Sequence, residues 1–262
     1  PDLDRAHQFF VDFGMQCSAR TPTALYMRGT GPAHHLHVAE LGEPKFLGLA
    51  FLAATPADLH ALSQAPGASA VKPTGEPGGG LRVTLTDPDG NRVEVVHGIE
   101  PLAAITPAVL PMNDATHGLR RAGTLSRHTR RSAQVVRIGH AVLKSHRSRQ
   151  LVQWYQDTLG LLCSDEVLQP NGQLALSFNR VDRGDEYVDH HVLLIDIGPK
   201  AGINHTAYEI CDLDDLMLGH EHLKAKGYEN VWGVGRHVYG GQLFDYWMDP
   251  WEFMYEHWTD TD

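Results

Sequence analysis

The stretch MDPWEFMYEHW (residues 248–258) has a counterpart in TDPDGNRVEVV (residues 86–96), and this repeat decides the fold. In both stretches an Asp-Pro turn stands between two strand-like segments, as a β-hairpin requires. The two copies lie in opposite halves of a chain of 262 residues. The spacing therefore predicts one structural module that is used at corresponding places in both halves.

Two further pairs of segments extend the repeat. LDRAHQFFVDFGM (residues 3–15) and SRQLVQWYQDTLGL (residues 148–161) both predict amphipathic helices that stop at an Asp-x-(x)-Gly signal. FLGLAFLAATPADLHAL (residues 46–62) and INHTAYEICDLDDLMLG (residues 203–219) each predict a buried strand, a capping turn and a helix. Each half is thus predicted to be a βαβββ module followed by a second βαβββ module, which is an α+β pattern.

The two halves differ where they begin. The second half opens with the strand-like segment VRIGHAVLKS (residues 136–145), whereas the first half starts directly at its helix. The sequence also lacks an initiator Met. We expect the natural chain to carry a further strand ahead of residue 3.

The chain length fits two domains of ordinary size, each able to bury its own core. We predict one module pair at residues 1–118, a linker at 119–136 and the other module pair at 137–262. The region around the linker is Pro-rich at first and Arg-rich later. In an acidic chain we interpret the arginines as a solvated linker rather than a nucleic-acid patch.

The composition excludes several classes of protein. The net charge of -10 argues against nucleic acid or anionic lipid as a partner. No apolar run approaches the roughly 20 residues of a membrane span, and no signal peptide is visible. The 3 cysteines are an odd number without CxxC spacing, which argues against a disulfide scaffold and favours a cytoplasmic protein.

Three separate strands of the second half carry potential metal ligands. His140 lies in VRIGHAVLKS, His205 in INHTAYEI and Glu256 in MYEHW. Two imidazoles and one carboxylate on one face of a metal leave the opposite face open. This facial triad suits non-haem Fe(II) and O₂ chemistry, in which substrate and oxygen must both bind.

The internal repeat provides a control for this site. Aligning the halves places Gly48 where His205 stands, and Glu94 where Glu256 stands. The first half keeps the acid and lacks that histidine. We therefore predict a duplicated fold in which only the second half holds a metal.

Two other histidine clusters are less suited to a metal. HHLH (residues 34–37) lies in the half that lacks the counterpart of His205. In HEHL (residues 220–223) the histidines are two positions apart on a helix and do not share a face. We predict that the second cluster is solvated surface, and it does not match the HExxH of zinc proteases.

Three stretches together resemble the type I extradiol ring-cleaving dioxygenases of the vicinal oxygen chelate superfamily: IGHAVLKS, DHHVLLIDIG…INHTAYEI and GRHVYGGQLFDYWMDPWEFMYE. The resemblance implies two tandem vicinal-oxygen-chelate domains, in which paired βαβββ modules form a curved, cup-like mixed sheet. It implies Fe(II) bound by His140, His205 and Glu256 in the C-terminal, catalytic module pair. The N-terminal pair would be the metal-free duplicate. Mn(II) also suits this ligand set.

The resemblance also implies roles for three residues near the metal. His191, fourteen residues before His205, would be the acid-base group. The adjacent His190 is its rival, because only one of two successive strand residues can face the cavity. His237 and Tyr246, nine residues apart, would hydrogen-bond the substrate and the oxygen species.

The sequence departs from the family pattern at a few positions near Tyr246. Asp245 stands where an apolar residue is usual, and Glu252 stands where glycine is usual. Asp245 should point to the face of the strand opposite to that of Tyr246. These departures bear on the substrate class more than on the metal.

The resemblance implies an enzyme that cleaves a catecholic ring next to its two hydroxyls and incorporates both atoms of O₂. Its partners would be that substrate and O₂, and relatives of this kind usually form homo-oligomers.

Two alternatives stay open. One is a non-oxidative divalent-metal enzyme of the isomerase or epimerase type. The other is a metal-free small-molecule-binding protein of the same superfamily.

Overall fold

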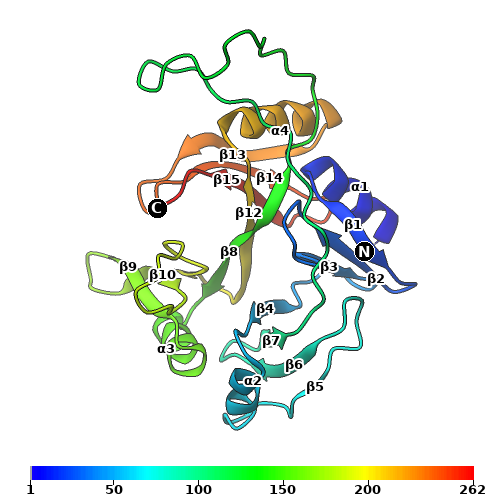
Figure 1. Ribbon diagram of the computed structural model, residues 1–262. Coiled ribbons are helices and arrows are strands. Elements are labelled where there is room, and N and C mark those ends of the chain that lie inside the picture. The colour runs from blue at the N-terminus through cyan, green and yellow to red at the C-terminus, as the bar shows by residue number, and fades with distance from the viewer. Residues whose placement is uncertain (1) are drawn as a thin grey trace.

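The repeated stretches fold as matching elements in both halves of the computed structural model, which describes residues 2–262 (Figure 1). The elements of the first half are α1 (Leu3–Phe13), β1 (Gln16–Arg20), β2 (Ala24–Arg28), β3 (His37–Glu40), β4 (Gly48–Leu52), α2 (Pro56–Leu62), β5 (Lys72–Pro73), β6 (Leu81–Thr86) and β7 (Arg92–His97). Those of the second half are β8 (Val135–Ser145), α3 (Ser148–Leu159), β9 (Leu162–Leu168), β10 (Leu174–Arg180), β11 (Leu193–Ile197), β12 (Gly202–Ile210), α4 (Leu213–Lys226), β13 (Glu229–Arg236), β14 (Leu243–Met248) and β15 (Met254–Thr259).

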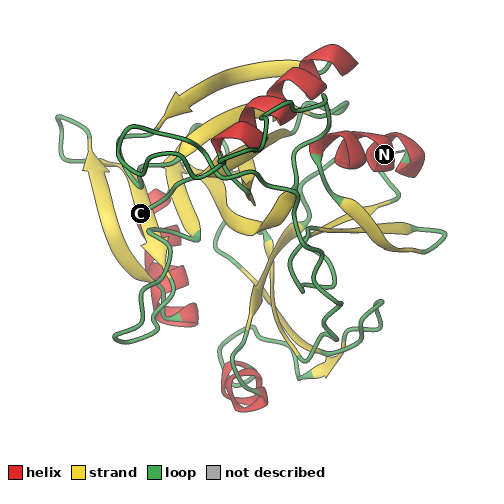
Figure 2. Ribbon diagram, turned by 45° about the horizontal axis from the view of Figure 1, so that its top comes forward, coloured by secondary structure: helices red, strands yellow, loops and turns green. Residues whose placement is uncertain are grey.

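The second half forms one large mixed sheet. Its eight strands lie in the order β13-β14-β15-β12-β8-β11-β10-β9. The long strand β8 joins the two modules, because it pairs in parallel with β11 and antiparallel with β12. The first half forms a three-stranded sheet, β1-β2-β3, and a four-stranded sheet, β4-β7-β6-β5. Helices lie on the outer sides of the curved sheets (Figure 2), and the predicted mixed α+β architecture is confirmed.

The helices begin and end at the residues that local chemistry favours. Asp2 and Asp212 cap α1 and α4 by accepting hydrogen bonds from backbone N–H groups of the first turn. Gly14 and Gly160 end α1 and α3 in the left-handed region, at φ +110° and +70°, so the predicted helix stops are confirmed. No helix within residues 2–262 combines the length and the apolar character that a membrane crossing needs.

The Asp-Pro turn that reveals the repeat is built in the same way in both halves. Asp87 and Asp249 each accept hydrogen bonds from the backbone N–H groups two and four residues later. The position three residues after the aspartate has positive φ in both copies. It is Gly90 at +89° in the first half and Glu252 at +67° in the second. The glycine that is usual there thus has a conformational reason.

The two hydrophobic cores are shared between the halves. In one core, Phe9 and Phe13 of α1 pack with Tyr208 and Tyr255 of the large sheet. In the other core, residues of β6, β7 and α2 are buried together with residues of β8, α3 and β11. The expectation that each half buries its own core is therefore wrong. An amphipathic pattern identifies the buried face of an element but not the element that covers it.

The histidines of the HEHL segment contribute to this packing. His222 Nε2 lies 3.1 Å from the carboxylate of Asp12 on α1, and His220 Nδ1 lies 3.1 Å from that of Asp245 on β14. Both carboxylates are buried. The two histidines do face different elements, but the prediction that they are solvated surface is wrong.

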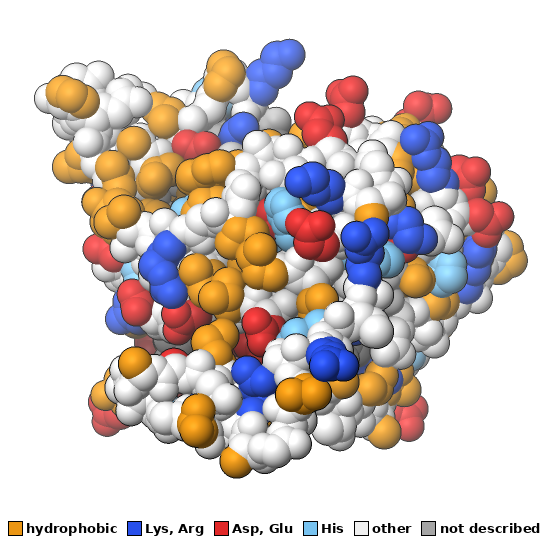
Figure 3. Space-filling view, turned by 90° about the horizontal axis from the view of Figure 1, so that it is seen from above, with side chains coloured by type: hydrophobic (Ala, Val, Ile, Leu, Met, Phe, Trp, Pro, Cys, Tyr) orange, Lys and Arg blue, Asp and Glu red, His pale blue; other side chains and the backbone are white. Residues whose placement is uncertain are grey.

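The segment between β7 and β8 runs along the surface over α4 (Figure 1). Leu119 and Leu125 are 81% and 69% exposed. Figure 3 shows this side of the molecule, with hydrophobic side chains gathered toward one side and charged side chains toward the other. Arg130 is exposed, as expected for a solvated linker. Arg131 is not, because its guanidinium donates to the buried carboxylate of Asp215 on α4.

Candidate metal centre

The strand register brings the predicted ligands onto one face of the large sheet. Ala207 on β12 is paired with His140 on β8 and with Glu256 on β15, so it stands between them. Residues paired across neighbouring strands share a face, and His205 shares that face because it lies two positions from Ala207. Tyr246 on β14 is the partner of Glu256 on the other side. The small side chain of Ala207 leaves space between the three side chains.

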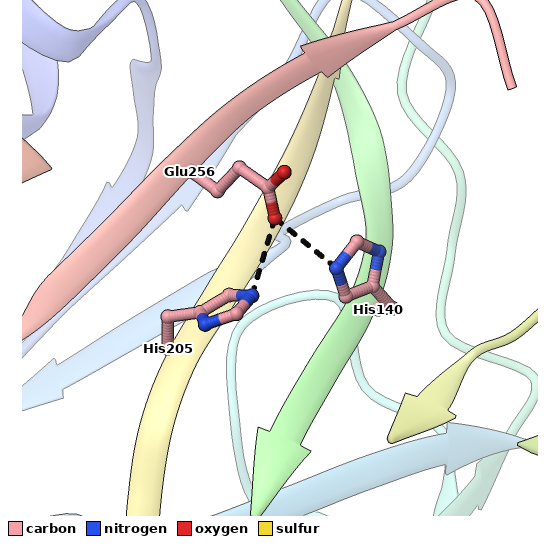
Figure 4. A group of neighbouring side chains, drawn as sticks. All are labelled: His140, His205 and Glu256. Carbon is pink, nitrogen blue, oxygen red and sulfur yellow. Dashed lines mark ion pairs between the residues drawn. The ribbon is translucent and has the colours of Figure 1, made fainter. Parts of the chain in front are cut away.

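The three side chains point toward this common space (Figure 4). His140 Nε2 and His205 Nε2 lie 3.1 and 3.2 Å from the same carboxylate oxygen, Glu256 Oε2. One donor atom from each residue can be chosen so that all lie within 4.8 Å of one another. All three residues are buried, and Glu256 is 0% exposed.

The spacing of the donor atoms suits a bound divalent cation better than it suits hydrogen bonds among the three side chains. His205 Nε2 and both carboxylate oxygens of Glu256 have no hydrogen-bond partner among the described residues, although they are close together. Ligand atoms that each lie about 2.1 Å from one ion, at right angles, are about 3 Å apart, which agrees with the observed spacing. Buried polar atoms are rarely left unpaired. We therefore regard the cluster as a cation site.

The protonation states of the cluster support this conclusion. Burial would raise the pKa of Glu256, but the neighbouring imidazoles of His140, His205 and His237 outweigh it and hold the pKa of that carboxyl well below its usual range. Burial lowers the pKa of His205. A carboxylate and a neutral imidazole are the forms that bind metals. His205 Nδ1 also lies 3.3 Å from Asn204 Oδ1, an acceptor that would leave Nε2 free for a ligand bond.

A glycine next to His140 leaves room for the ring of Trp258. A Cβ at Gly139 would lie 2.3 Å from the ring of Trp258. Since atoms cannot approach so closely, this position requires glycine.

His237 and Tyr246 lie together beside the carboxylate. His237 Nε2 is 2.9 Å from the hydroxyl of Tyr246 and 3.6 Å from Glu256 Oε1. Burial and then the charge of Glu256 raise the pKa of Tyr246, so its hydroxyl keeps its proton. The ring of Trp232 stacks parallel to that of Tyr246 at 5.8 Å and is 59% exposed. Sequence analysis did not single out Trp232, because an exposed aromatic residue has no periodic signal.

Asp245 has a structural role outside this cluster. It is 0% exposed and accepts hydrogen bonds from Trp247 Nε1 at 2.6 Å and Asn230 Nδ2 at 2.9 Å. It also pairs with His220. The expectation that it points away from the face of Tyr246 is confirmed by these contacts.

His191 and His190 take different positions. The ring of His191 lies 4.2 Å from that of His140 and is 3% exposed. Burial, and then the nearby His140 and His190, lower the pKa of His191 to about 2, so the imidazole is neutral. His190 turns toward β9, where its Nε2 lies 2.8 Å from the carboxylate of Asp165.

Sequence analysis did not single out Asp165. The signal that could have found it is the repeat itself. GMQCSAR (residues 14–20) aligns with GLLCSDE (residues 160–166), which places Ala19 opposite Asp165. An acid that is present in only one copy would have marked the position.

The first half has the same framework without the cation site. Gly48 pairs with Arg92 and Ala50 with Glu94, so the register places Gly48 at the position of His205, as the sequence alignment predicted. A Cβ at Gly48 would lie 2.0 Å from a backbone oxygen of Arg92, so a histidine could not replace it without a backbone shift. Arg82 lies 3.4 Å from the Glu94 carboxylate and supplies a positive charge there.

Comparisons with known proteins agree with this arrangement. A family model described as the Glyoxalase/Bleomycin resistance protein/Dioxygenase superfamily matches residues 1–95 and 137–256. Metapyrocatechase 2 of Cupriavidus necator is 30% identical over 265 aligned residues, which span 100% of this chain and 78% of that protein.

Solved structures of similar shape include a glyoxalase and two dioxygenases. An Mn(II)-bound glyoxalase from Novosphingobium aromaticivorans has a TM-score of 0.81 at 26% identity, covering 100% of this chain and 79% of its own. The 2,3-dioxygenase LapB from Pseudomonas sp. KL28 has a TM-score of 0.79 at 16% identity, and the match covers 100% of this chain and 89% of LapB. Homoprotocatechuate 2,3-dioxygenase from Brevibacterium fuscum has a TM-score of 0.77 at 19% identity, and the match covers 100% of this chain and 77% of that enzyme. At identities below 25%, the last two show the fold alone.

Proposed function

This chain belongs to the Glyoxalase/Bleomycin resistance protein/Dioxygenase superfamily, and from that premise we propose that it is a metal-dependent extradiol dioxygenase. It would cleave the ring of a catecholic compound next to its two hydroxyls and incorporate O₂. The observation that carries the proposal is the buried triad of His140, His205 and Glu256, in which His205 Nε2 and both Glu256 oxygens lack a hydrogen-bond partner among the described residues. The whole-chain similarity to a metapyrocatechase supports the choice of reaction.

A divalent cation bound by the triad would act as a Lewis acid and lower the pKa of a catechol hydroxyl. We propose Fe(II) as that cation, because a facial triad with open positions is typical of non-haem Fe(II) oxygenases. Mn(II) suits the same ligands, and the glyoxalase from Novosphingobium aromaticivorans is described as Mn(II)-bound.

We propose that His191 acts as the base. Its neutral imidazole lies against the metal ligand His140, within the buried part of the site. A proton from the second catechol hydroxyl passes to a ring nitrogen of His191, and the hydroxyl oxygen keeps the electron pair. The imidazolium can later return that proton to the product as an acid.

The pair formed by His237 and Tyr246 would stabilise negative charge that develops beside the metal. The tyrosine hydroxyl and the imidazole are already held together at 2.9 Å, so little reorganisation is needed when charge appears. Their position next to Glu256 supports this role.

A second candidate function is a non-oxidative reaction at the same metal. The glyoxalase from Novosphingobium aromaticivorans favours it, because its structure is 26% identical to this chain, against 16% and 19% for the two dioxygenase structures. The two functions differ in one measurable respect, namely the consumption of O₂.

The test is anaerobic loading of the protein with Fe(II), followed by a panel of 3- and 4-substituted catechols and ¹⁸O₂. We expect a yellow ring-opened product that contains two ¹⁸O atoms, with one O₂ consumed for each product. His205→Ala should lose both the bound iron and the product. Bound iron without oxygen uptake on any catechol would favour the non-oxidative function.

We also propose that the protein forms a homo-oligomer and is located in the cytoplasm. Size-exclusion chromatography with light scattering would measure the first, and fractionation of the native host cells would measure the second.

A further inference from the structure

A chain of three side chains leads from the surface to the proposed base. His190 Nε2 lies 2.8 Å from Asp165 Oδ2, and His190 Nδ1 lies 3.2 Å from His191 Nδ1. The exposed fraction falls along the chain, from 46% for the Asp165 side chain to 13% for that of His190 and 3% for His191.

The acceptor at the outer end determines where the hydrogens lie. An ionised carboxylate only accepts hydrogen bonds, so His190 Nε2 must carry a hydrogen. When Nε2–H is the one hydrogen on the His190 ring, its Nδ1 carries a lone pair, and the hydrogen shared with its neighbour belongs to His191 Nδ1. This leaves the lone pair of a neutral His191 on Nε2.

We propose that Asp165 and His190 are positioning residues that hold His191 in the Nδ1–H tautomer, with Nε2 as its proton-accepting atom. This inference rests on the proposed function, in which His191 takes the substrate proton. The two residues do not touch the reacting atoms themselves. They act by removing the competing tautomer, in which Nε2 would be a donor and could not accept that proton.

The first half contains the same histidine pair, which provides an internal comparison. His34 Nδ1 lies 3.1 Å from His35 Nδ1, and the two rings meet at 81°, against 87° in the second half. An aromatic ring packs edge-on against the inner histidine in both copies. The histidine contact is therefore a feature of the module itself, with or without a metal site.

The carboxylate distinguishes the copy that has the metal ligands. Ala19 is paired with Tyr26, and Asp165 is paired with Phe178, at the equivalent place in each module. The methyl side chain of Ala19 offers no acceptor. Asp165 thus determines which histidine donates the hydrogen bond in the second copy. In the first copy, Ala19 cannot determine the donor.

Nitrogen-15 NMR of histidine-labelled protein tests the tautomer directly. We would load the full chain with Zn(II), which is diamagnetic, and identify the His191 signals by their loss in His191→Asn. We expect the hydrogen on Nδ1 in the wild type, and a mixture or the reverse tautomer in Asp165→Ala. A hydrogen on His191 Nε2 in the wild type would overturn the proposal.

Kinetics of matched variants provide a second test. Asp165→Ala and His190→Leu should lower kcat about 10- to 100-fold, with KM and metal content almost unchanged. Asp165→Asn keeps an acceptor for Nε2–H, and His190→Asn places an oxygen where Nδ1 accepts. Both should keep kcat within about threefold of the wild type. Equal losses in the alanine or leucine variant and its asparagine partner would count against the proposal.

The control is His34→Leu, which breaks the same histidine contact in the first half and should leave kcat unchanged. The NMR result does not depend on turnover, so the two proposals can fail separately. A protein with the Nδ1–H tautomer that cleaves no catechol would disprove the dioxygenase and keep the tautomer assignment. An active dioxygenase with the opposite tautomer would disprove the positioning role alone.

Discussion

At the residue scale, the space for the cation depends on one small side chain. Ala207 is fully buried and stands between His140 and Glu256. Any larger residue there would fill the volume in which the three donor atoms converge. The size of this residue is therefore as much a condition for metal binding as the ligands themselves.

Ala207→Val is expected to lower metal affinity at least about tenfold while the protein stays folded, because the added methyl groups occupy the ion's space. Metal content after dialysis measures the effect. The matched control is Ala50→Val, at the equivalent place beside Glu94 in the first half, which should leave metal content unchanged. Full metal content in Ala207→Val would contradict the proposed position of the ion.

Tyr246→Phe removes the hydroxyl that is bonded to His237, and we expect it to lower kcat roughly 100-fold without loss of metal. Tyr208→Phe serves as a control, because the Tyr208 hydroxyl contacts His37 and belongs to the core. Steady-state kinetics on the preferred catechol distinguish the two variants. A normal kcat in Tyr246→Phe would exclude its hydroxyl from the reaction.

Sequence was sufficient to predict that His140, His205 and Glu256 converge, but not every residue that surrounds them. His205 and Glu256 could be predicted because the repeat fixes which strand each occupies and which residue replaces it in the other half. The repeat marks Asp165 as an acid that is present in only one copy, but its contact with His190 could not be predicted, because that contact depends on the order of β9, β10 and β11 in the sheet. Strand order is a tertiary property that no local pattern contains.

At the element scale, the Asp-Pro turn between β14 and β15 contains a residue in an unfavourable conformation. Glu252 has φ +67°, where its counterpart in the first half is glycine. A side chain in the left-handed region costs about 1 kcal/mol or more. The turn supports the strand that carries Glu256, so the turn and the site are coupled through β15.

Glu252→Gly is expected to raise the free energy of unfolding by about 1 kcal/mol, and urea denaturation measures this change. The reciprocal variant is Gly90→Ala, whose Cβ would meet no atom within 4 Å. It should lower the free energy of unfolding by a similar amount through backbone strain alone. A neutral Glu252→Gly would mean that another interaction compensates for the strain.

At the scale of the whole molecule, the two halves are joined by their cores more firmly than by the linker. Sequence periodicity predicted α1 and α3 correctly, but it could not show that α1 packs on the sheet of the other half. The carboxylate of Asp12 adds a polar connection to His222 and Lys226 of α4 and to Tyr228, which follows the helix. The neighbouring Gln8 and this set of groups hold the pKa of Asp12 below its usual value despite burial, so the carboxylate remains ionised.

Limited trypsin digestion should cut the exposed linker, at residues such as Arg120, Arg127 and Arg130. We expect the two fragments to separate on a denaturing gel and to elute together on native size exclusion, with iron retained. Two fragments that elute separately, each folded, would contradict the shared cores. Arg131 should be cut more slowly, since it is bound to Asp215.

Stability should fall at acidic pH through the core between the halves. Burial lowers the pKa of His37 to about 4, from an ordinary value of 6.5. Between these values the unfolded chain binds the proton and the folded chain does not, so stability decreases as the pH falls from 6.5 to 4. The loss is on the order of 2 kcal/mol, after allowance for the partial exposure of His37.

His37→Asn keeps a polar partner for Tyr208 and removes this titration, so its unfolding free energy should depend less on pH in that range. The difference between variant and wild type at pH 4 and pH 7 isolates His37, because other groups contribute equally to both proteins. Parallel pH profiles would assign the acid sensitivity to other groups.

The shared cores also determine where inactivating mutations will be found. The ring of Phe13 stacks on His257 at 3.8 Å, and its backbone oxygen accepts a hydrogen bond from that histidine, the residue next to Glu256. In a random-mutagenesis screen for lost activity, many hits should therefore map to the half that carries no metal ligand. A geneticist who placed the active site by counting such hits would assign part of it to the wrong half of the gene.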